Sequence, residues 1–83
     1  MRYTVINLPD AEDELARLWM AASDRDAVSR ASNEIDAILR VFPLSRGYAH
    51  GNSRILTIKP LTVVYTVSPE DCQVTILQYL YQE

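Results

Sequence analysis

The most β-rich segment of this 83-residue chain is Pro60-Leu61-Thr62-Val63-Val64-Tyr65-Thr66-Val67. β-Branched and aromatic residues favour strands because they pack well on a pleated surface. Ser68-Pro69-Glu70-Asp71 follows with the composition of a turn, and the chain from Cys72 to Tyr81 is expected to return as the last strand. Upstream, residues 54–59 alternate in hydrophobicity and predict a strand that Pro60 interrupts. The C-terminal part of the chain therefore predicts a three-stranded antiparallel meander.

Two amphipathic helices are predicted before these strands. Apolar side chains recur at helical spacing in residues 11–22, and the acids at the start of this segment complement the helix dipole. A second apolar stripe runs from Val28 to Phe42, and Pro43 closes it. Because almost no loop separates the two segments, they are expected to form an antiparallel hairpin.

Polar residues before each helix predict where the helices begin. Asn7 and Asp10 have the spacing of a capping box, in which the first side chain accepts a hydrogen bond from a free backbone N–H. Ser23 provides the corresponding cap for the second helix, with Asp26 three residues on. The first helix is therefore expected to start after Asn7 and the second after Ser23.

The order of elements predicts the architecture. Residues 2–8 alternate well enough for a short N-terminal strand, which most naturally pairs at an edge of the later three. Residues 43–53 contain both glycines and predict an irregular connection. A helical hairpin must bury its apolar stripes against the sheet, so residues 1–83 are expected to form one two-layer α+β domain.

Composition excludes several classes of protein. The chain is 48% hydrophobic and 23% charged, which is typical of a folded globular protein. No apolar run approaches the roughly 20 residues that span a bilayer, and the start lacks a signal-peptide h-region, so we expect a cytoplasmic protein without membrane contact.

Cys72 is the only cysteine, which excludes an intrachain disulfide and a multi-cysteine zinc site, and we interpret it as an ordinary strand residue. Metal-ligand spacings and Gly-rich phosphate loops are also absent from the sequence, so no metal or cofactor is predicted.

Charge is unevenly distributed along the chain. The net charge is −3 and the pI is about 5.0, which counts against strong affinity for RNA or DNA. Eight of the eleven acids fall within residues 10–36, whereas Arg46, Arg54 and Lys59 lie in a stretch without acids between Phe42 and Pro69. Any surface that faces an anion is expected there.

The element order and several segments resemble the RelE/ParE superfamily of toxins, also known as plasmid-stabilisation proteins. The segments that carry the resemblance are Ala11-Glu12-Asp13-Glu14-Leu15 with Leu18-Trp19, Ile35 through Phe42-Pro43 with Gly47, Arg54-Ile55-Leu56, and the β-rich run with Val74-Thr75-Ile76-Leu77. Members fold as a helical hairpin on an antiparallel sheet. The resemblance implies a growth-inhibiting toxin of a type II toxin–antitoxin pair, held inactive by a cognate antitoxin.

Two targets follow from the two branches of this superfamily. RelE-type members cut messenger RNA on the ribosome with sheet Lys and Arg residues and a C-terminal Tyr or His. The resemblance thus implies catalytic roles for Arg54 and Tyr81, and target-binding roles for Lys59 and Tyr79. The usual basic C-terminal tail with its His is missing here. ParE-type members poison DNA gyrase without nuclease residues, and the helix hairpin with Trp19 resembles that branch more.

The connection between helices and strands supplies further candidates. Arg46 and Tyr48 flank Gly47, and functional loops favour such residues, so both are predicted to bind a target. The sole histidine, His50, is interpreted as an inert loop residue, and Tyr65 as a core residue with its hydroxyl at the rim.

Two other functional classes stay open at this point. One is a catalytically inactive, toxin-like interaction module that keeps antitoxin binding, which the acidic pI favours. The other is a homodimer that covers its own apolar surface.

Overall fold

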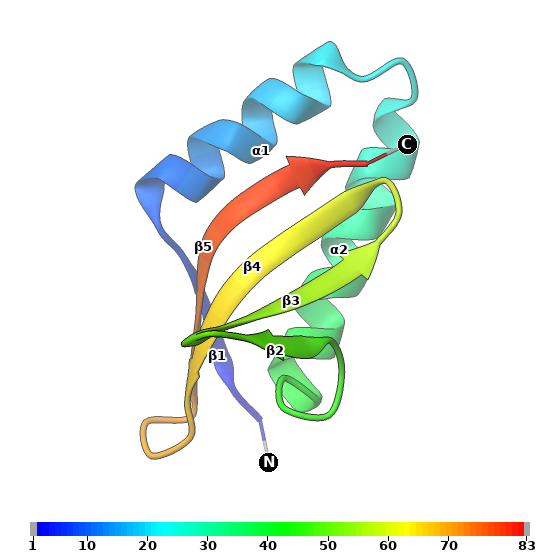
Figure 1. The fold of residues 1–83 in the computed structure, drawn as a ribbon. Coiled ribbons are helices and arrows are strands. Elements are labelled where there is room, and N and C mark those ends of the chain that lie inside the picture. The colour runs from blue at the N-terminus through cyan, green and yellow to red at the C-terminus, as the bar shows by residue number, and fades with distance from the viewer. Residues whose placement is uncertain (1, 83) are drawn as a thin grey trace.

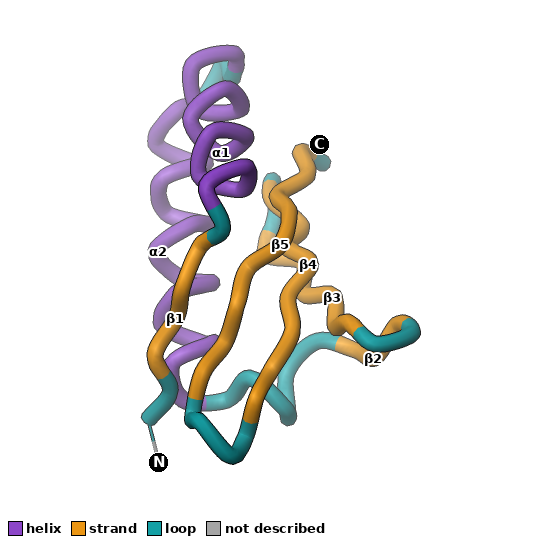
Figure 2. Tube along the Cα trace, turned by 90° about the vertical axis from the view of Figure 1, so that its left-hand side faces the viewer, coloured by secondary structure: helices purple, strands orange, loops and turns teal. Residues whose placement is uncertain are grey.

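The computed structural model describes residues 2–82 as two helices on one face of a sheet (Figure 1). The elements in chain order are β1 (Thr4–Asn7), α1 (Pro9–Ala21), α2 (Arg25–Val41), β2 (Tyr48–His50), β3 (Ser53–Ile58), β4 (Leu61–Ser68) and β5 (Gln73–Tyr81). Seen from the side, the helices form one layer and the strands the other (Figure 2). The predicted two-layer α+β architecture is confirmed. Within the described residues, neither helix is long and apolar enough to cross a membrane.

The sheet has five strands in the order β1-β5-β4-β3-β2. β1 lies at an edge and pairs with β5 in parallel, whereas the other neighbours are antiparallel. The predicted irregular connection contains one more strand than expected, because residues 48–50 pair with residues 53–55 around a turn in which Gly51 has a φ of 62°. The meander therefore has four strands instead of three.

Both predicted helix starts are wrong, by one residue in each case. Leu8 occupies the cap position of α1 without a side-chain hydrogen bond, and Pro9 begins the helix, where its missing N–H costs nothing. The side chain of Asn7 is used elsewhere, as an acceptor for the hydroxyl of Tyr79. In α2, Asp24 takes the place expected for Ser23, and its Oδ1 accepts a hydrogen bond of 3.0 Å from the backbone N–H of Ala27.

The core lies between the two helices and the helix-facing side of the sheet. α2 contributes most of the helical share, since five of its apolar side chains are buried and α1 buries only Ala11. The fully buried residues of greatest volume are Tyr65, Ile35, Leu39, Leu61, Ile76, Val28, Val63, Val74 and Pro43. The apolar stripe predicted for α2 therefore covers the strands predicted from the C-terminal sequence.

A bulge in β5 decides which of its side chains face the helices. Tyr65 pairs with Ile76, but the preceding residue of β4 pairs with Gln78, so Leu77 is an extra residue. Side chains alternate between the faces of a strand, so a regular β5 would place Gln78 beside Ile76 on the core face. The bulge places Tyr79 there instead, with 3% of its surface exposed.

Cys72 lies in the turn before β5 and not in a strand, which corrects the interpretation from sequence. Its φ is 49°, and its Sγ lies 3.7 Å from the carbonyl oxygen of Pro69. The turn itself was predicted correctly from Ser68-Pro69-Glu70-Asp71, but β5 begins one residue later than expected.

Candidate functional site

Three of the predicted site residues gather at the end of β3 that adjoins the connection from α2. Tyr48 pairs with Ile55, so it lies beside the neighbour of Arg54. The Nη2 of Arg54 donates a hydrogen bond of 3.2 Å to the carbonyl oxygen of Arg46. Arg46, Tyr48 and Arg54 therefore form one local group.

Lys59 follows the opposite end of β3, and Tyr81 ends β5 beside the start of β4. Lys59 is exposed in the turn between β3 and β4. Tyr81 pairs with Leu61 just after that turn, and the backbone N–H of Gln82 donates to the carbonyl oxygen of Pro60 at 2.6 Å. These two predicted site residues form a second group, separate from the first.

The two predicted catalytic residues lie far apart. Arg54 pairs with Tyr65 of β4, and Tyr81 pairs with Leu61 of the same strand. Four residues along a strand correspond to roughly 13 Å and two strand spacings to roughly 10 Å, so the two backbones are roughly 16 Å apart. A general acid or base must come within hydrogen-bond reach of the atom that it serves. Arg54 and Tyr81 are therefore not neighbours in the sheet, and their joint catalytic role stays a prediction.

The guanidinium of Arg54 is bound to the chain's own backbone. Its Nη2 lies 3.1 Å from the carbonyl oxygen of Leu44, 3.2 Å from that of Arg46 and 3.5 Å from that of Gly47. Its Nε is buried and has no hydrogen-bond partner among the described residues. The geometry thus makes Arg54 a residue that positions the connection between α2 and β2, hereafter the α2–β2 loop (residues 42–47).

Tyr65 holds the same loop from the neighbouring strand. Its hydroxyl lies 2.9 Å from the carbonyl oxygen of Pro43 and 3.1 Å from that of Arg46. The prediction that Tyr65 packs in the core is confirmed, but its hydroxyl lies beneath the α2–β2 loop and not at the rim, since the residue is fully buried. Gly47, with a φ of 73°, lets the chain pass closely over this hydroxyl.

The outer side of the α2–β2 loop is apolar and cationic. Phe42, Leu44 and Tyr48 are 54%, 49% and 59% exposed, and Arg46 of the same segment is exposed as well. We call Phe42, Leu44, Arg46 and Tyr48 the loop surface. Arg46 and Tyr48 were predicted from the sequence to bind a target. Phe42 was interpreted only as the end of a helix, and Leu44 only as part of a connection. The feature of the sequence that could have indicated them is the presence of a large apolar residue on each side of Pro43.

Tyr79, also predicted to bind a target, is buried between the sheet and the helices. Its hydroxyl donates a hydrogen bond of 3.0 Å to Oδ1 of Asn7. Burial raises the pKa of Tyr79 from 10.0 to about 12, and the negative charges of Asp36 and Glu12 add to the effect. Tyr79 therefore joins β5 to the end of β1 and is buried, unlike Tyr81 two residues further along β5.

This raised pKa predicts how stability changes in alkaline solution. At low pH, Tyr79 is protonated in both the folded and the unfolded chain, and its contribution to the free energy of unfolding is fully present. As pH rises from 10 toward 12, the unfolded chain releases the proton before the folded one, so stability is lost. At about pH 11 the free energy of unfolding should have fallen by about 1.4 kcal/mol more in the wild type than in Tyr79→Phe. Urea unfolding at a series of pH values measures this difference, and parallel curves for the two proteins would contradict it.

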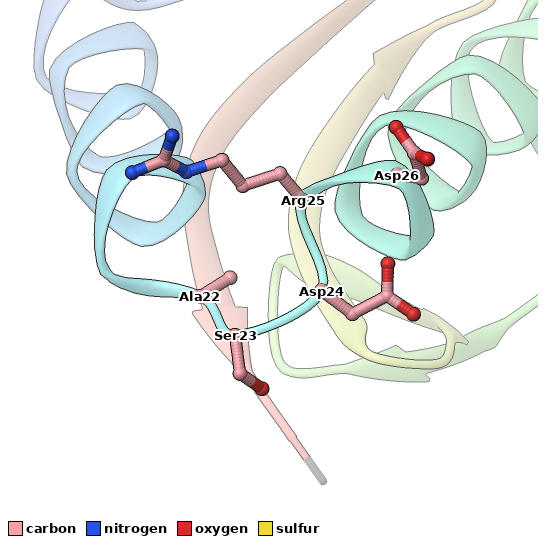
Figure 3. Close-up of a pocket in the computed structure, with 5 residues that line it drawn as sticks. All are labelled: Ala22, Ser23, Asp24, Arg25 and Asp26. Atoms are coloured by element: carbon pink, nitrogen blue, oxygen red, sulfur yellow. The ribbon is translucent and has the colours of Figure 1, made fainter.

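Two surface hollows lie beside the turn between the helices. A polar hollow of about 470 Å³ is formed by residues 22–26 at the turn between the helices. Figure 3 shows its charged side chains pointing in different directions. The guanidinium of Arg25 lies 4.8 Å from the centre of the Trp19 ring and donates to the carbonyl oxygen of Met20 at 3.1 Å, so it stabilises the turn. An apolar hollow of about 330 Å³ separates the end of α1 from Tyr81.

His50 is exposed on the edge strand β2, instead of in the irregular loop expected from sequence. Residues 2–82 contain no group of three or more His, Cys, Asp or Glu side chains placed to hold a metal ion.

Comparison with solved structures identifies the fold. The whole topology matches a chain of the RelBE2 toxin–antitoxin complex from Mycobacterium tuberculosis, with a TM-score of 0.79 and 16% identity over 99% of this chain and 93% of that one. The fold is that of RelE/ParE toxins. A chain of the ParDE system of Pseudomonas aeruginosa gives a TM-score of 0.72 at 14% identity, over 99% of this chain and 98% of that one.

The RelE/ParE fold extends to archaeal structures. A chain of the RelE–RelB complex from Pyrococcus horikoshii matches with a TM-score of 0.70 and 19% identity, over 99% of this chain and 97% of that one. No protein-family model matches the sequence, and no curated protein matches it either. With identities of 19% or less, the shared property of these chains is the RelE/ParE fold, which confirms the resemblance seen in the sequence.

Proposed function

We propose that this chain is the toxin component of a type II toxin–antitoxin pair and is neutralised by a cognate antitoxin. The observation that supports this function is the fold, which matches chains from toxin–antitoxin complexes over 99% of the present chain. Its helix hairpin and open strand edges also offer the two surfaces on which peptides commonly bind, a helix groove and a sheet edge.

We further propose that the target is a protein, DNA gyrase, in preference to ribosome-bound messenger RNA. Arg54 lies near the start of β3 and Tyr81 at the end of β5, two strands away, and the Nη2 of Arg54 is bound by the carbonyl groups of the α2–β2 loop. The net charge of −3 also disfavours a polyphosphate, since phosphate contacts supply most of the affinity for nucleic acids.

Expression without the antitoxin tests the proposal. We expect induced expression of the chain alone to arrest growth, and coexpression of a short neighbouring gene that encodes the antitoxin to restore it. Purified protein should inhibit DNA supercoiling by gyrase and should leave messenger RNA intact in a ribosome translation assay. Tyr81→Phe should arrest growth as the wild type does, because the hydroxyl has no catalytic role under this mechanism.

A toxin-like interaction module without activity is the second candidate. The separation of Arg54 from Tyr81 in the sheet and the acidic pI of about 5.0 favour it. Under this function the neighbouring protein still binds, but cells that express the chain alone continue to grow. Arrest that disappears in Tyr81→Phe, together with cleaved messenger RNA, would overturn both candidates and support an RNA-cleaving toxin.

A further inference from the structure

The loop surface, formed by Phe42, Leu44, Arg46 and Tyr48, combines exposed apolar side chains with positive charge. Its three apolar members are each about half exposed or more within one short segment. Soluble proteins seldom leave large apolar side chains grouped on the surface without a binding role. An apolar centre with charged residues around it is also the usual composition of a protein interface.

The backbone beneath this surface is held by hydrogen bonds from two side chains of the sheet. Tyr65 and Arg54 donate to the carbonyl oxygens of Pro43, Leu44 and Arg46 from below. The backbone N–H of Arg46 also donates to the carbonyl oxygen of Phe42 at 3.2 Å, which closes the loop into a turn. A surface that is already ordered loses little conformational entropy when a partner binds. The loop surface is therefore preformed.

The positive charge of the loop surface indicates that its partner carries negative charge. No acid occurs between Phe42 and Pro69 in the sequence, and Arg46 forms no ion pair within residues 2–82. The exposed Arg2 lies between this end of α2 and the acidic turn at Glu70 and Asp71, because the backbone N–H of Tyr3 donates to the carbonyl oxygen of Arg40 at 2.7 Å and that of Thr4 to the carbonyl oxygen of Cys72 at 2.8 Å. The positive charge of the loop surface therefore comes from Arg46. The positive charge here contrasts with the net charge of −3 for the whole chain.

We propose that the loop surface binds a short segment of another protein that carries acidic and large apolar side chains. Phe42, Leu44 and Tyr48 would contact its apolar residues, and Arg46 its carboxylates. Nucleic acid is a poorer match, because an RNA strand would gain few phosphate contacts from so few cations. The inference goes beyond the toxin function proposed above and does not require that the chain arrest growth.

Selection from a random dodecapeptide phage library on the purified chain tests this inference. We expect the retained peptides to have net negative charge and several large apolar residues, and to bind more weakly as salt is raised. Chemical shifts in NMR titrations with a retained peptide should change first at the amides of residues 42–48. Leu44→Ser with Arg46→Glu should weaken that peptide at least about tenfold, because it removes an apolar contact and reverses the charge.

A matched variant on α1 controls for nonspecific effects. Arg17→Glu with Met20→Ser makes the same kinds of change at exposed positions of α1, where Met20 is 67% exposed, and should alter binding less than about twofold. Both double variants change exposed side chains, and their NMR spectra check that they fold. The inference fails if no peptide is enriched, if retained peptides lack acids, if both variants weaken binding equally, or if shifts fall outside residues 42–48. It also fails if a labelled RNA dodecamer binds this loop more tightly than the peptide.

Discussion

Gly47→Ala is expected to lower the free energy of unfolding by about 3 kcal/mol, by combining backbone strain with a steric clash. Gly47 has a φ of +73°, a conformation in which a Cβ costs roughly 1–2 kcal/mol. The added Cβ would also lie 2.5 Å from the carbonyl oxygen of Ile55 and 3.0 Å from the hydroxyl of Tyr65. The first of these atoms belongs to the backbone of β3 and cannot move without disturbing the pairing with β2 and β4.

Gly51→Ala is the matched control for this prediction. Gly51 has a similar φ of +62°, but nothing lies within 4 Å of its added Cβ. The loss should therefore be limited to backbone strain, about 1 kcal/mol. Urea unfolding of the two variants and the wild type measures both values. Equal losses in the two variants would show that the close approach of the α2–β2 loop to β3 does not constrain the protein.

Patterns within single segments explain how much of the fold was predictable. The apolar stripe from Val28 to Phe42 needs only its own spacing to be recognised, and the structure buries its Val28, Ile35 and Leu39. The β-rich run from Leu61 to Val67 is equally local, and it became β4. The spacing of apolar residues shows which face of the helix must be buried, and the β-rich run predicts the strand that it covers. The two-layer arrangement could therefore be predicted from these two segments.

The features that could not be predicted from the sequence depend on contacts between segments far apart along the chain. Asn7 matched a helix cap, but Tyr79, 72 residues away, takes its side chain as an acceptor. β2 consists of only Tyr48–His50, and its strand conformation comes from pairing with β3. The bulge at Leu77 likewise depends on the register between β4 and β5. Local propensity contains none of this information.

The candidate site was predictable as a set of residues but not as an arrangement. The acid-free stretch indicated the region of Arg46 and Arg54, because charge asymmetry is visible in the sequence, and a target-binding role for this region stays a prediction. The separation of Arg54 from Tyr81 requires the register of three strands. The use of Arg54 as a donor to loop carbonyl groups requires the path of the α2–β2 loop as well. Sequence reasoning therefore joined residues that the sheet keeps apart.

The loop that Arg54 and Tyr65 hold should loosen when the hydroxyl of Tyr65 is removed. Tyr65→Phe keeps the buried ring but takes away the donor that lies 2.9 Å from the carbonyl oxygen of Pro43 and 3.1 Å from that of Arg46. A buried acceptor left without its partner costs about 1–3 kcal/mol, so we expect the free energy of unfolding to fall by about 2 kcal/mol. Urea unfolding measures this loss directly.

Tyr81→Phe makes the same chemical change at a position with little expected effect. Tyr81 is 37% exposed, and its hydroxyl has no hydrogen-bond partner within residues 2–82, so its removal should change stability by less than about 0.5 kcal/mol. In Tyr65→Phe, amide hydrogen exchange should accelerate at Arg46, whose N–H closes the loop turn, more than in the central strand β4. Peptides that bind the loop surface should also lose affinity, because the preformed backbone now has to be ordered on binding. An unchanged exchange rate at Arg46, with full stability, would mean that Arg54 alone fixes the loop.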